Sequence, residues 1–291
     1  MATAKRDEEP SPAKESVDRL VSFAPSNTEL IYAVGGEDKL VANSTYCNYP
    51  EEAKRKTRSG TFISAKYEML TKLKPELVLL VSGQEGLASQ IDKHGFKTRT
   101  LPNNKISDIA DNLEILGELC GAKERAHLLS TQFRDSIVQL ENILKNSKHP
   151  NVLFCVWTHP AVSVGGESFL HDVITICGAQ NATDSFSASY PKLTDEKVIT
   201  LKPEILILPN EARQEKIISR PPWSSLNAVK SKKFYYLPPA EEDQLSRPTL
   251  RILTGLHWLS TRLHPEKRED LDAWLKSNKH LILIRDKHIE G

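Results

Sequence analysis

The sequence predicts an α/β protein in which two Rossmann-like α/β lobes are bridged by one long rigid α-helix, with a ligand cleft between the lobes. The first observation is an amphipathic helix near the middle of the chain. Its apolar residues recur three or four positions apart, which is one face of a helix. They are Ala126, Leu129, Phe133, Ile137, Leu140 and Leu144. At about 1.5 Å per residue the segment 122–145 would span roughly 35 Å.

The second observation is a repeat on either side of this helix. Residues 68–80 read EMLTKLKPELVLL, and residues 196–208 read EKVITLKPEILIL. Both follow the pattern E-x-x-x-x-L-K-P-E and then continue as an apolar run. Each copy predicts a short helix, a proline turn and a buried strand, which is the second half of an α/β unit. The repeat therefore predicts two similar lobes.

In the first lobe, residues 19–121, turn residues separate short apolar runs from helical patterns. Residues 1–18 are charged and contain proline, so we expect them to be disordered. Ser26 or Asn27 is the expected N-cap of the first helix. The basic run 54–58 is expected to be solvated surface. The expected strands are 19–24, 39–43, 77–81 and 96–101, and the expected helices begin after Pro25 and cover 87–93 and 106–119.

The second lobe, residues 149–265, follows the linking helix at 122–148 and ends with a closing helix. Two loops, 184–191 and 238–247, carry aromatic and polar residues. The expected strands are 151–157, 205–208 and 233–237, with an extended segment at 162–166 and helices at 167–177 and 250–263. Residues 266–291 form a charged tail with one expected helix and an apolar patch at 281–284.

Composition excludes several classes of protein. The 291 residues are 39% hydrophobic and 26% charged, as in globular proteins, and the net charge of +1 argues against nucleic-acid binding. No apolar run approaches the roughly 20 residues that span a bilayer. The four cysteines lack metal-site spacing, so we expect buried, reduced thiols. Glycine-rich phosphate motifs and hydrolase motifs are missing, so we expect no catalytic residue, metal or cofactor.

Four aromatic residues are expected on loops that leave strands: Tyr46, Phe62, Trp157 and Tyr190. Ligands of open α/β sheets bind at the carboxyl ends of strands, where such loops meet. Aromatic walls from both lobes, with the polar loop 241–247, would suit a large flat small molecule. Ordinary core contacts would explain any one of these aromatics alone.

Several longer segments carry a family resemblance. They read LVSFAPSNTELIYAVGG, STYCNYP, VGGESFLHDVITICGAQNA, YPKLTDE and YYLPPAEEDQLSRPTLRI, in addition to the two LKPE units. Over roughly residues 19–265 the chain resembles the substrate-binding proteins of class III ABC importers, most closely their cobalamin (vitamin B12)-binding branch. This resemblance implies a non-enzymatic, monomeric protein with a corrinoid between its lobes. Because the linking helix is expected to be stiff, we expect little closure on binding.

The resemblance also implies roles for individual residues. Tyr46 matches a tyrosine that lines the corrin site, and Phe62 and Tyr190 take the places of other aromatic wall residues. The implied ligand-binding set is Pro25, Ser26, Tyr46, Phe62, Trp157, Tyr190, Asp243, Gln244, Leu245, Ser246 and Arg247. Glu68 and Glu196 match paired glutamates that dock onto arginines of a permease dimer. An acidic side chain in the first turn of a helix stabilises the helix N-terminus electrostatically, and this would explain both glutamates without a partner protein.

The chain departs from this family in two respects. Family members are normally exported, but the first residues lack the apolar core of a secretory signal. We therefore expect a cytoplasmic protein as written, or a periplasmic one if a leader has been removed. The cobalamin branch can carry a disulfide from the position of Cys177 to the closing helix, yet residues 256–263 contain no cysteine.

Three alternatives remain open at this point. The same fold can hold a ferric siderophore or haem. An enzyme of the two-lobed metallocluster or sugar-phosphate type would need clustered cysteines or a phosphate loop. A cytosolic scaffold would keep the fold, lose the ligand and bind proteins through its charged tail.

Overall fold

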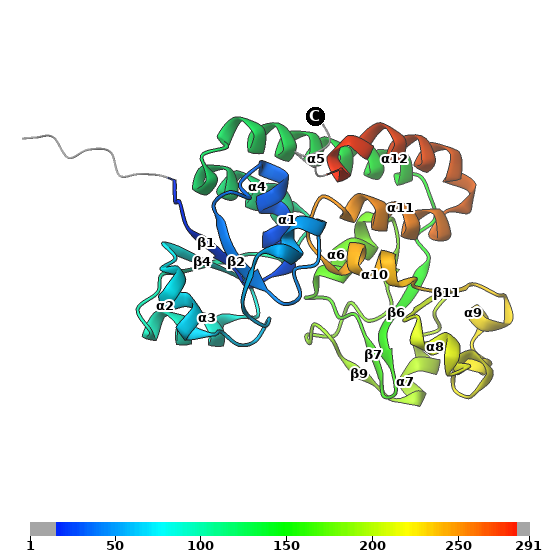
Figure 1. Ribbon diagram of the computed structural model, residues 1–291. Helices are drawn as coiled ribbons and strands as arrows, with labels where there is room; N and C mark the ends of the chain where they lie inside the picture. The colour runs from blue at the N-terminus through cyan, green and yellow to red at the C-terminus, as the bar shows by residue number, and fades with distance from the viewer. Residues whose placement is uncertain (1–15, 284–291) are drawn as a thin grey trace, which may run out of the picture.

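The computed structural model describes residues 16–283 and shows two α/β lobes under one long helix. In Figure 1 the blue-to-cyan lobe holds the first part of the chain and the green-to-yellow lobe the second. The helix α5 (Lys123–Leu144) runs across the top of both. The predicted fold class is therefore confirmed.

The first lobe is a five-stranded sheet in the order β3-β2-β1-β4-β5, with every neighbouring pair parallel. Parallel sheets need both faces covered, which explains the continuous apolar runs of their strands. The strands are β1 (Leu20–Ser22), β2 (Leu40–Ser44), β3 (Thr57–Gly60), β4 (Leu77–Val81) and β5 (Thr98–Leu101). The helices are α1 (Pro25–Val34), α2 (Tyr67–Leu73), α3 (Glu85–Lys93) and α4 (Ser107–Cys120), with a 3₁₀ turn, η1 (Glu51–Arg55), before β3.

The second lobe is built on a mixed sheet in the order β11-β10-β6-β7-β9, with β8 also paired to β6. Its centre is parallel, and the hairpin of β6 and β7 adds an antiparallel edge. The strands are β6 (Asn151–Thr158), β7 (Ala161–Ser163), β8 (Gln180–Asn181), β9 (Lys192–Leu193), β10 (Ile205–Leu208) and β11 (Phe234–Tyr236). The helices are α6 (Phe169–Ile176), α7 (Asp195–Thr200), α8 (Glu211–Gln214), α9 (Asn227–Lys230), α10 (Pro239–Ser246) and α11 (Ile252–Leu263), with 3₁₀ turns η2 (Ile217–Ser219) and η3 (Trp223–Ser225).

The helix predicted in the tail is α12 (Arg268–Ile282), which follows the turn η4 (Pro265–Lys267) and lies along α5. Its Trp274 is buried, and the indole Nε1 donates a hydrogen bond of 2.8 Å to the backbone oxygen of Ser136. This contact and the apolar face of α12 support the second half of α5. Of the predicted patch 281–284, residue 284 lies outside the described residues.

The two LKPE units adopt the same structure. Lys74 and Lys202 both have left-handed backbone angles, with φ of 47° and 45°. The following glutamate then pairs with the start of the central strand in each lobe. The Glu76 amide donates to the Arg19 oxygen at 2.9 Å, and the Glu204 amide donates to the Asn151 oxygen at 2.8 Å. The repeated sequence therefore encodes a repeated connection between helix and strand.

Two local expectations were wrong, and a third holds only in part. Residues 239–246 form α10 rather than part of a loop. The N-cap of α1 is Ala24, because Pro25 begins the helix; Asn27 lies inside it and its amide donates to the Leu80 oxygen. The basic run is exposed at Lys54 and Arg55, as expected, but Arg58 in β3 is half-buried and its guanidinium donates to the backbone oxygens of Ser44 and Cys47.

We predict that Gly117→Ala destabilises the protein. Gly117 lies in α4 where it meets α5, and an added Cβ would come within 2.2 Å of the Ala126 Cβ. Helix propensity alone would stabilise the variant by about 1 kcal/mol. Overpacking between two helices costs about 1–3 kcal/mol, and a contact this short belongs at the upper end. Urea unfolding should show a net loss of about 2 kcal/mol.

Gly86→Ala is the matched control for this experiment. Gly86 is exposed in α3, and no atom lies within 4 Å of its added Cβ. This variant should be neutral or slightly more stable. Equal effects of the two substitutions would contradict the close α4–α5 contact.

Candidate functional site

A pocket of about 540 Å³ lies between the two lobes. The first lobe supplies residues that follow the carboxyl ends of its parallel strands, and the second lobe supplies one end of α10. The lining residues are Ala24, Pro25, Ser26, Tyr46, Phe62, Ile63, Val81, Asn103, Asp243, Ser246, Arg247 and Pro248. The pocket therefore occupies the place where open α/β sheets bind ligands.

The aromatic wall of the pocket comes from two loops of the first lobe. Tyr46 follows β2 and is 58% exposed. Phe62 follows β3 in a tight turn that Gly60 permits, since a Cβ on Gly60 would meet the Ser64 oxygen at 2.1 Å. The buried amide of Gln84 donates to the Phe62 oxygen and holds this turn against β4. The Phe62 ring is thus presented by a fixed backbone.

A buried ion cluster joins the two lobes beside the pocket. Glu29 of α1 is 2% exposed, and its carboxylate lies 3.2 Å from Arg247 Nη1 and 3.2 Å from Arg251 Nη1. Arg247 also bonds to Asn48 Oδ1 at 2.6 Å and to Asp243 Oδ1 at 2.8 Å. Burial raises the pKa of Glu29, and the attraction of Arg251 and Arg247 opposes this rise.

This cluster determines the electrostatics of the pocket. Arg247 is the only basic residue in the lining, and two carboxylates neutralise it. The lining contains no histidine or cysteine. What remains is an aromatic and aliphatic surface with hydroxyl groups from Tyr46, Ser26 and Ser246. Such a surface suits a flat, weakly charged ligand better than an anion.

Four residues of the predicted ligand-binding set lie elsewhere. Leu245 is fully buried in the core, against Gly255 of α11, so its predicted ligand contact was wrong. Gln244 is half-buried and does not line the pocket. Trp157 and Tyr190 are each 52% exposed in the second lobe and also lie outside the lining.

The sequence prediction missed three residues of the first-lobe wall and cluster. Ile63, which is 82% exposed, is the neighbour of the predicted Phe62, and Asn103 follows β5 just as Tyr46 follows β2. The strand-end rule could have identified both. Glu29 had no such signal, because a glutamate in an amphipathic helix is normally solvated.

The two glutamates of the repeat are in equivalent, exposed places. Glu68 lies in the first turn of α2 and Glu196 in the first turn of α7. In both lobes this turn precedes the left-handed lysine of the LKPE unit. The two carboxylates are therefore related by the internal repeat.

The described residues offer little other chemistry. No group of His, Cys, Asp or Glu among residues 16–283 could hold a metal ion. The four cysteines are free and buried, and burial raises the pKa of Cys155 and of Cys177 to about 12. Within the same residues, every helix is too short or too polar to cross a membrane.

We predict that Glu29→Gln destabilises the protein by about 3 kcal/mol, because it leaves two mostly buried arginines without their shared carboxylate. Urea unfolding at neutral pH measures this loss. Asp243→Asn is the matched control, since it removes another carboxylate partner of Arg247 from a side chain that is 40% exposed. It should cost less than about 1 kcal/mol. Similar losses in both variants would contradict the special role of Glu29.

Comparison with known proteins gives the family. Relatives include the vitamin B12-binding protein of Vibrio vulnificus strain YJ016, which is 28% identical over 242 residues, 82% of this chain and 88% of the relative. An uncharacterized ABC transporter substrate-binding lipoprotein of Bacillus subtilis, YvrC, is 26% identical over 262 residues, 87% of this chain and 82% of the relative.

Solved structures share the fold. The periplasmic vitamin B12 binding protein BtuF of Vibrio cholerae superposes with a TM-score of 0.73 at 24% identity, covering 90% of this chain and 98% of that one. The periplasmic heme-binding protein RhuT from Roseiflexus sp. RS-1 superposes with a TM-score of 0.71 at 20% identity, covering 88% of this chain and 100% of that one. The profile of the periplasmic binding protein family matches residues 20–241, so the chain belongs to this family.

Proposed function

We propose that this protein is a non-enzymatic substrate-binding protein that holds a corrinoid, cobalamin, in the pocket between its lobes. One observation carries the proposal: the interlobe pocket has an aromatic wall from Tyr46 and Phe62 and a charge-neutral opposite side. A relative named for vitamin B12 binding aligns along 82% of the chain. The resemblance of the pocket segments to the cobalamin-binding branch points the same way.

The proposed ligand lies with its ring edge against Tyr46 and Phe62. Asp243, Ser246 and Arg247 of the α10 end face it from the second lobe. A volume of about 540 Å³ falls within the usual range for ligand pockets, roughly 300–1,000 Å³. The remainder of a cobalamin would extend out of the pocket. There the exposed Trp157 and Tyr190 are proposed secondary contacts.

The charge of the pocket favours a corrinoid over the rival ligands. An anionic ferric siderophore needs a free arginine or lysine. Here Arg247 is held by Glu29 and Asp243 at 3.2 and 2.8 Å. Haem needs an axial His or Tyr, and Tyr46 is the only such residue in the lining. Haem is therefore the second candidate ligand, and its binding would depend on the phenol of Tyr46 alone.

We further propose that Glu68 and Glu196 dock the loaded protein onto an ABC permease. Two exposed carboxylates at repeat-related places suit a two-fold partner, and charge pairing orients such complexes. This role places the protein on the extracytoplasmic side of the membrane. A chain kept in the cytoplasm would instead act as a soluble corrinoid carrier.

The first prediction here concerns ligand identity. Titration with cyanocobalamin, followed by absorbance and calorimetry, should show saturable one-to-one binding, with haem and a ferric hydroxamate binding more weakly. Tyr46→Ala should weaken cobalamin binding about ten-fold or more, because it removes a large aromatic contact. Tyr67→Ala is the control, since Tyr67 stacks on His94 away from the pocket. The affinity of this variant for cobalamin should be unchanged.

Tyr46→Phe separates the corrinoid from haem. It retains the ring that contacts a corrinoid, so cobalamin affinity should change less than about three-fold. It removes the phenol that haem would need, so haem affinity should fall far more. Binding of haem alone, lost in Tyr46→Phe, would overturn the corrinoid assignment and keep the fold. Absence of binding to all three ligands would favour the scaffold alternative.

The second prediction concerns docking. The double substitution Glu68→Lys and Glu196→Lys should abolish capture of the loaded protein by a vitamin B12 permease in lipid nanodiscs, since it replaces attraction by repulsion. Cobalamin affinity should remain that of the unmodified protein. Glu211→Lys is a control, at an exposed carboxylate of α8. Undiminished capture of the double variant would show that both glutamates act only as helix N-terminal charges.

A further inference from the structure

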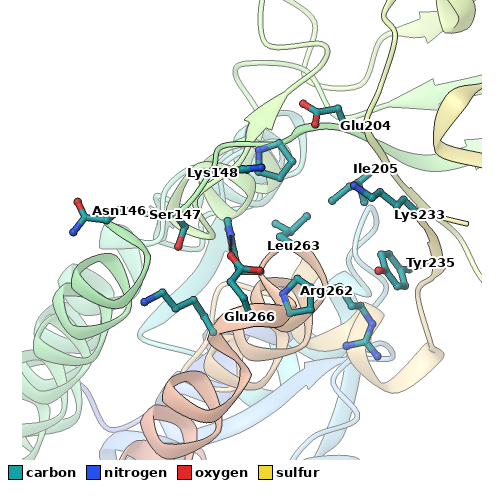
Figure 2. A pocket seen from close by; sticks show the side chains of 14 residues that line it. Asn146, Ser147, Lys148, Glu204, Ile205, Lys233, Tyr235, Arg262, Leu263 and Glu266 are labelled. Carbon is teal, nitrogen blue, oxygen red and sulfur yellow. Dashed lines mark ion pairs between the residues drawn. The ribbon is translucent and has the colours of Figure 1, made fainter. Parts of the chain in front are cut away.

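A second pocket, of about 560 Å³, shares no lining residue with the interlobe pocket, and Figure 2 shows the side chains that line it. It forms where α5 ends, where β10 and β11 begin, and where α11 leads into η4. It is therefore at the amino edge of the second-lobe sheet, whereas the interlobe pocket lies at carboxyl ends of the first-lobe strands. Neither the proposed corrinoid nor the docking glutamates use it.

Basic side chains predominate in this pocket. Lys148, Lys233, Arg262 and Lys267 line it, against two carboxylates. One of these, Glu204, accepts a hydrogen bond of 3.1 Å from the Asn151 amide.

Arg262 is the central residue. Its guanidinium carbon lies 4.0 Å from the centre of the Trp258 ring and 5.9 Å from that of Tyr235. Its Nη1 donates to the backbone oxygen of Trp258 at 2.8 Å, but within the described part of the chain it forms no ion pair. Burial lowers the pKa of this arginine, and the attraction of the Glu241 carboxylate partly opposes this shift. An anion would therefore compensate a cation that is partly desolvated.

The pocket also holds polar and apolar groups that complete a binding site. The hydroxyl of Ser147 is enclosed and has no hydrogen-bond partner among residues 16–283. Such a buried group usually has a hydrogen-bond partner. Tyr235, Ile205 and Leu263 supply an apolar surface beside the cations.

We propose that this pocket binds a small phosphorylated molecule. The planar guanidinium of Arg262 matches two phosphate oxygens, and Lys148 and Lys233 neutralise the remaining charge. The Tyr235 ring contacts the organic part of the ligand.

The test is calorimetric titration of the full-length protein with sodium pyrophosphate and, separately, with citrate, at low and physiological ionic strength. Pyrophosphate should bind at both salt concentrations. Arg262→Gln should weaken this binding about ten-fold, and Lys233→Gln, at an exposed position, several-fold. Lys230→Gln, on the exposed surface of α9, should leave it unchanged. Cobalamin affinity should be the same in all variants.

Three results would overturn the proposal: no pyrophosphate binding, an equal loss in Lys230→Gln, or citrate binding as tightly as pyrophosphate. If circular dichroism shows that Arg262→Gln does not fold, the Lys233→Glu variant is used to test the site instead. Loss of pyrophosphate binding in that variant supports the site, and retention overturns it. Because cobalamin is titrated beside pyrophosphate, failure here and failure of the corrinoid assignment give different results.

Discussion

The ion cluster of Glu29 with Arg247 and Arg251 links the two lobes next to the pocket, and the geometry of the site depends on it. A buried carboxylate is tolerated only when it is paired, because an unpaired charge in the interior costs several kcal/mol. Separation of the lobes at this point would break that pairing. Since α5 holds the lobes together at the other side, the cleft has two fixed connections. Large closing motions on ligand binding would have to break one of them.

The sequence predicted most elements because their determinants are local. The apolar face of α5 and the two LKPE units are examples, since helical periodicity and a proline turn act within about ten residues. The helix α10 had no such signal: its segment PAEEDQLS is polar, and only Leu245 is buried, against Gly255 of α11. That contact is tertiary, and it also keeps Leu245 out of the pocket lining.

The sequence identified pocket-lining residues where one physical rule sufficed. Tyr46 and Phe62 follow parallel strands of one sheet, whose carboxyl ends share an edge. The rule does not give the orientation of the second lobe, so it could not place Tyr190. Trp157 lies within β6, paired with Val162 of β7, rather than on a loop leaving the strand. The antiparallel hairpin that causes this depends on the turn after residue 158, which the apolar pattern of β6 does not reveal.

One helix relates the two pockets. Arg251 immediately precedes α11, and Arg262 lies near its end, about 16 Å further along at 1.5 Å per residue. Arg251 shares the buried Glu29 carboxylate with Arg247. Arg262 contacts aromatic rings and a carbonyl of its own helix, and among residues 16–283 it forms no ion pair, although the Glu241 carboxylate attracts it from a greater distance. The same residue type therefore has opposite electrostatic consequences at the two ends of α11. Neutralisation makes the interlobe pocket unsuitable for anions, and the cation left at the other end makes the second pocket suitable for them.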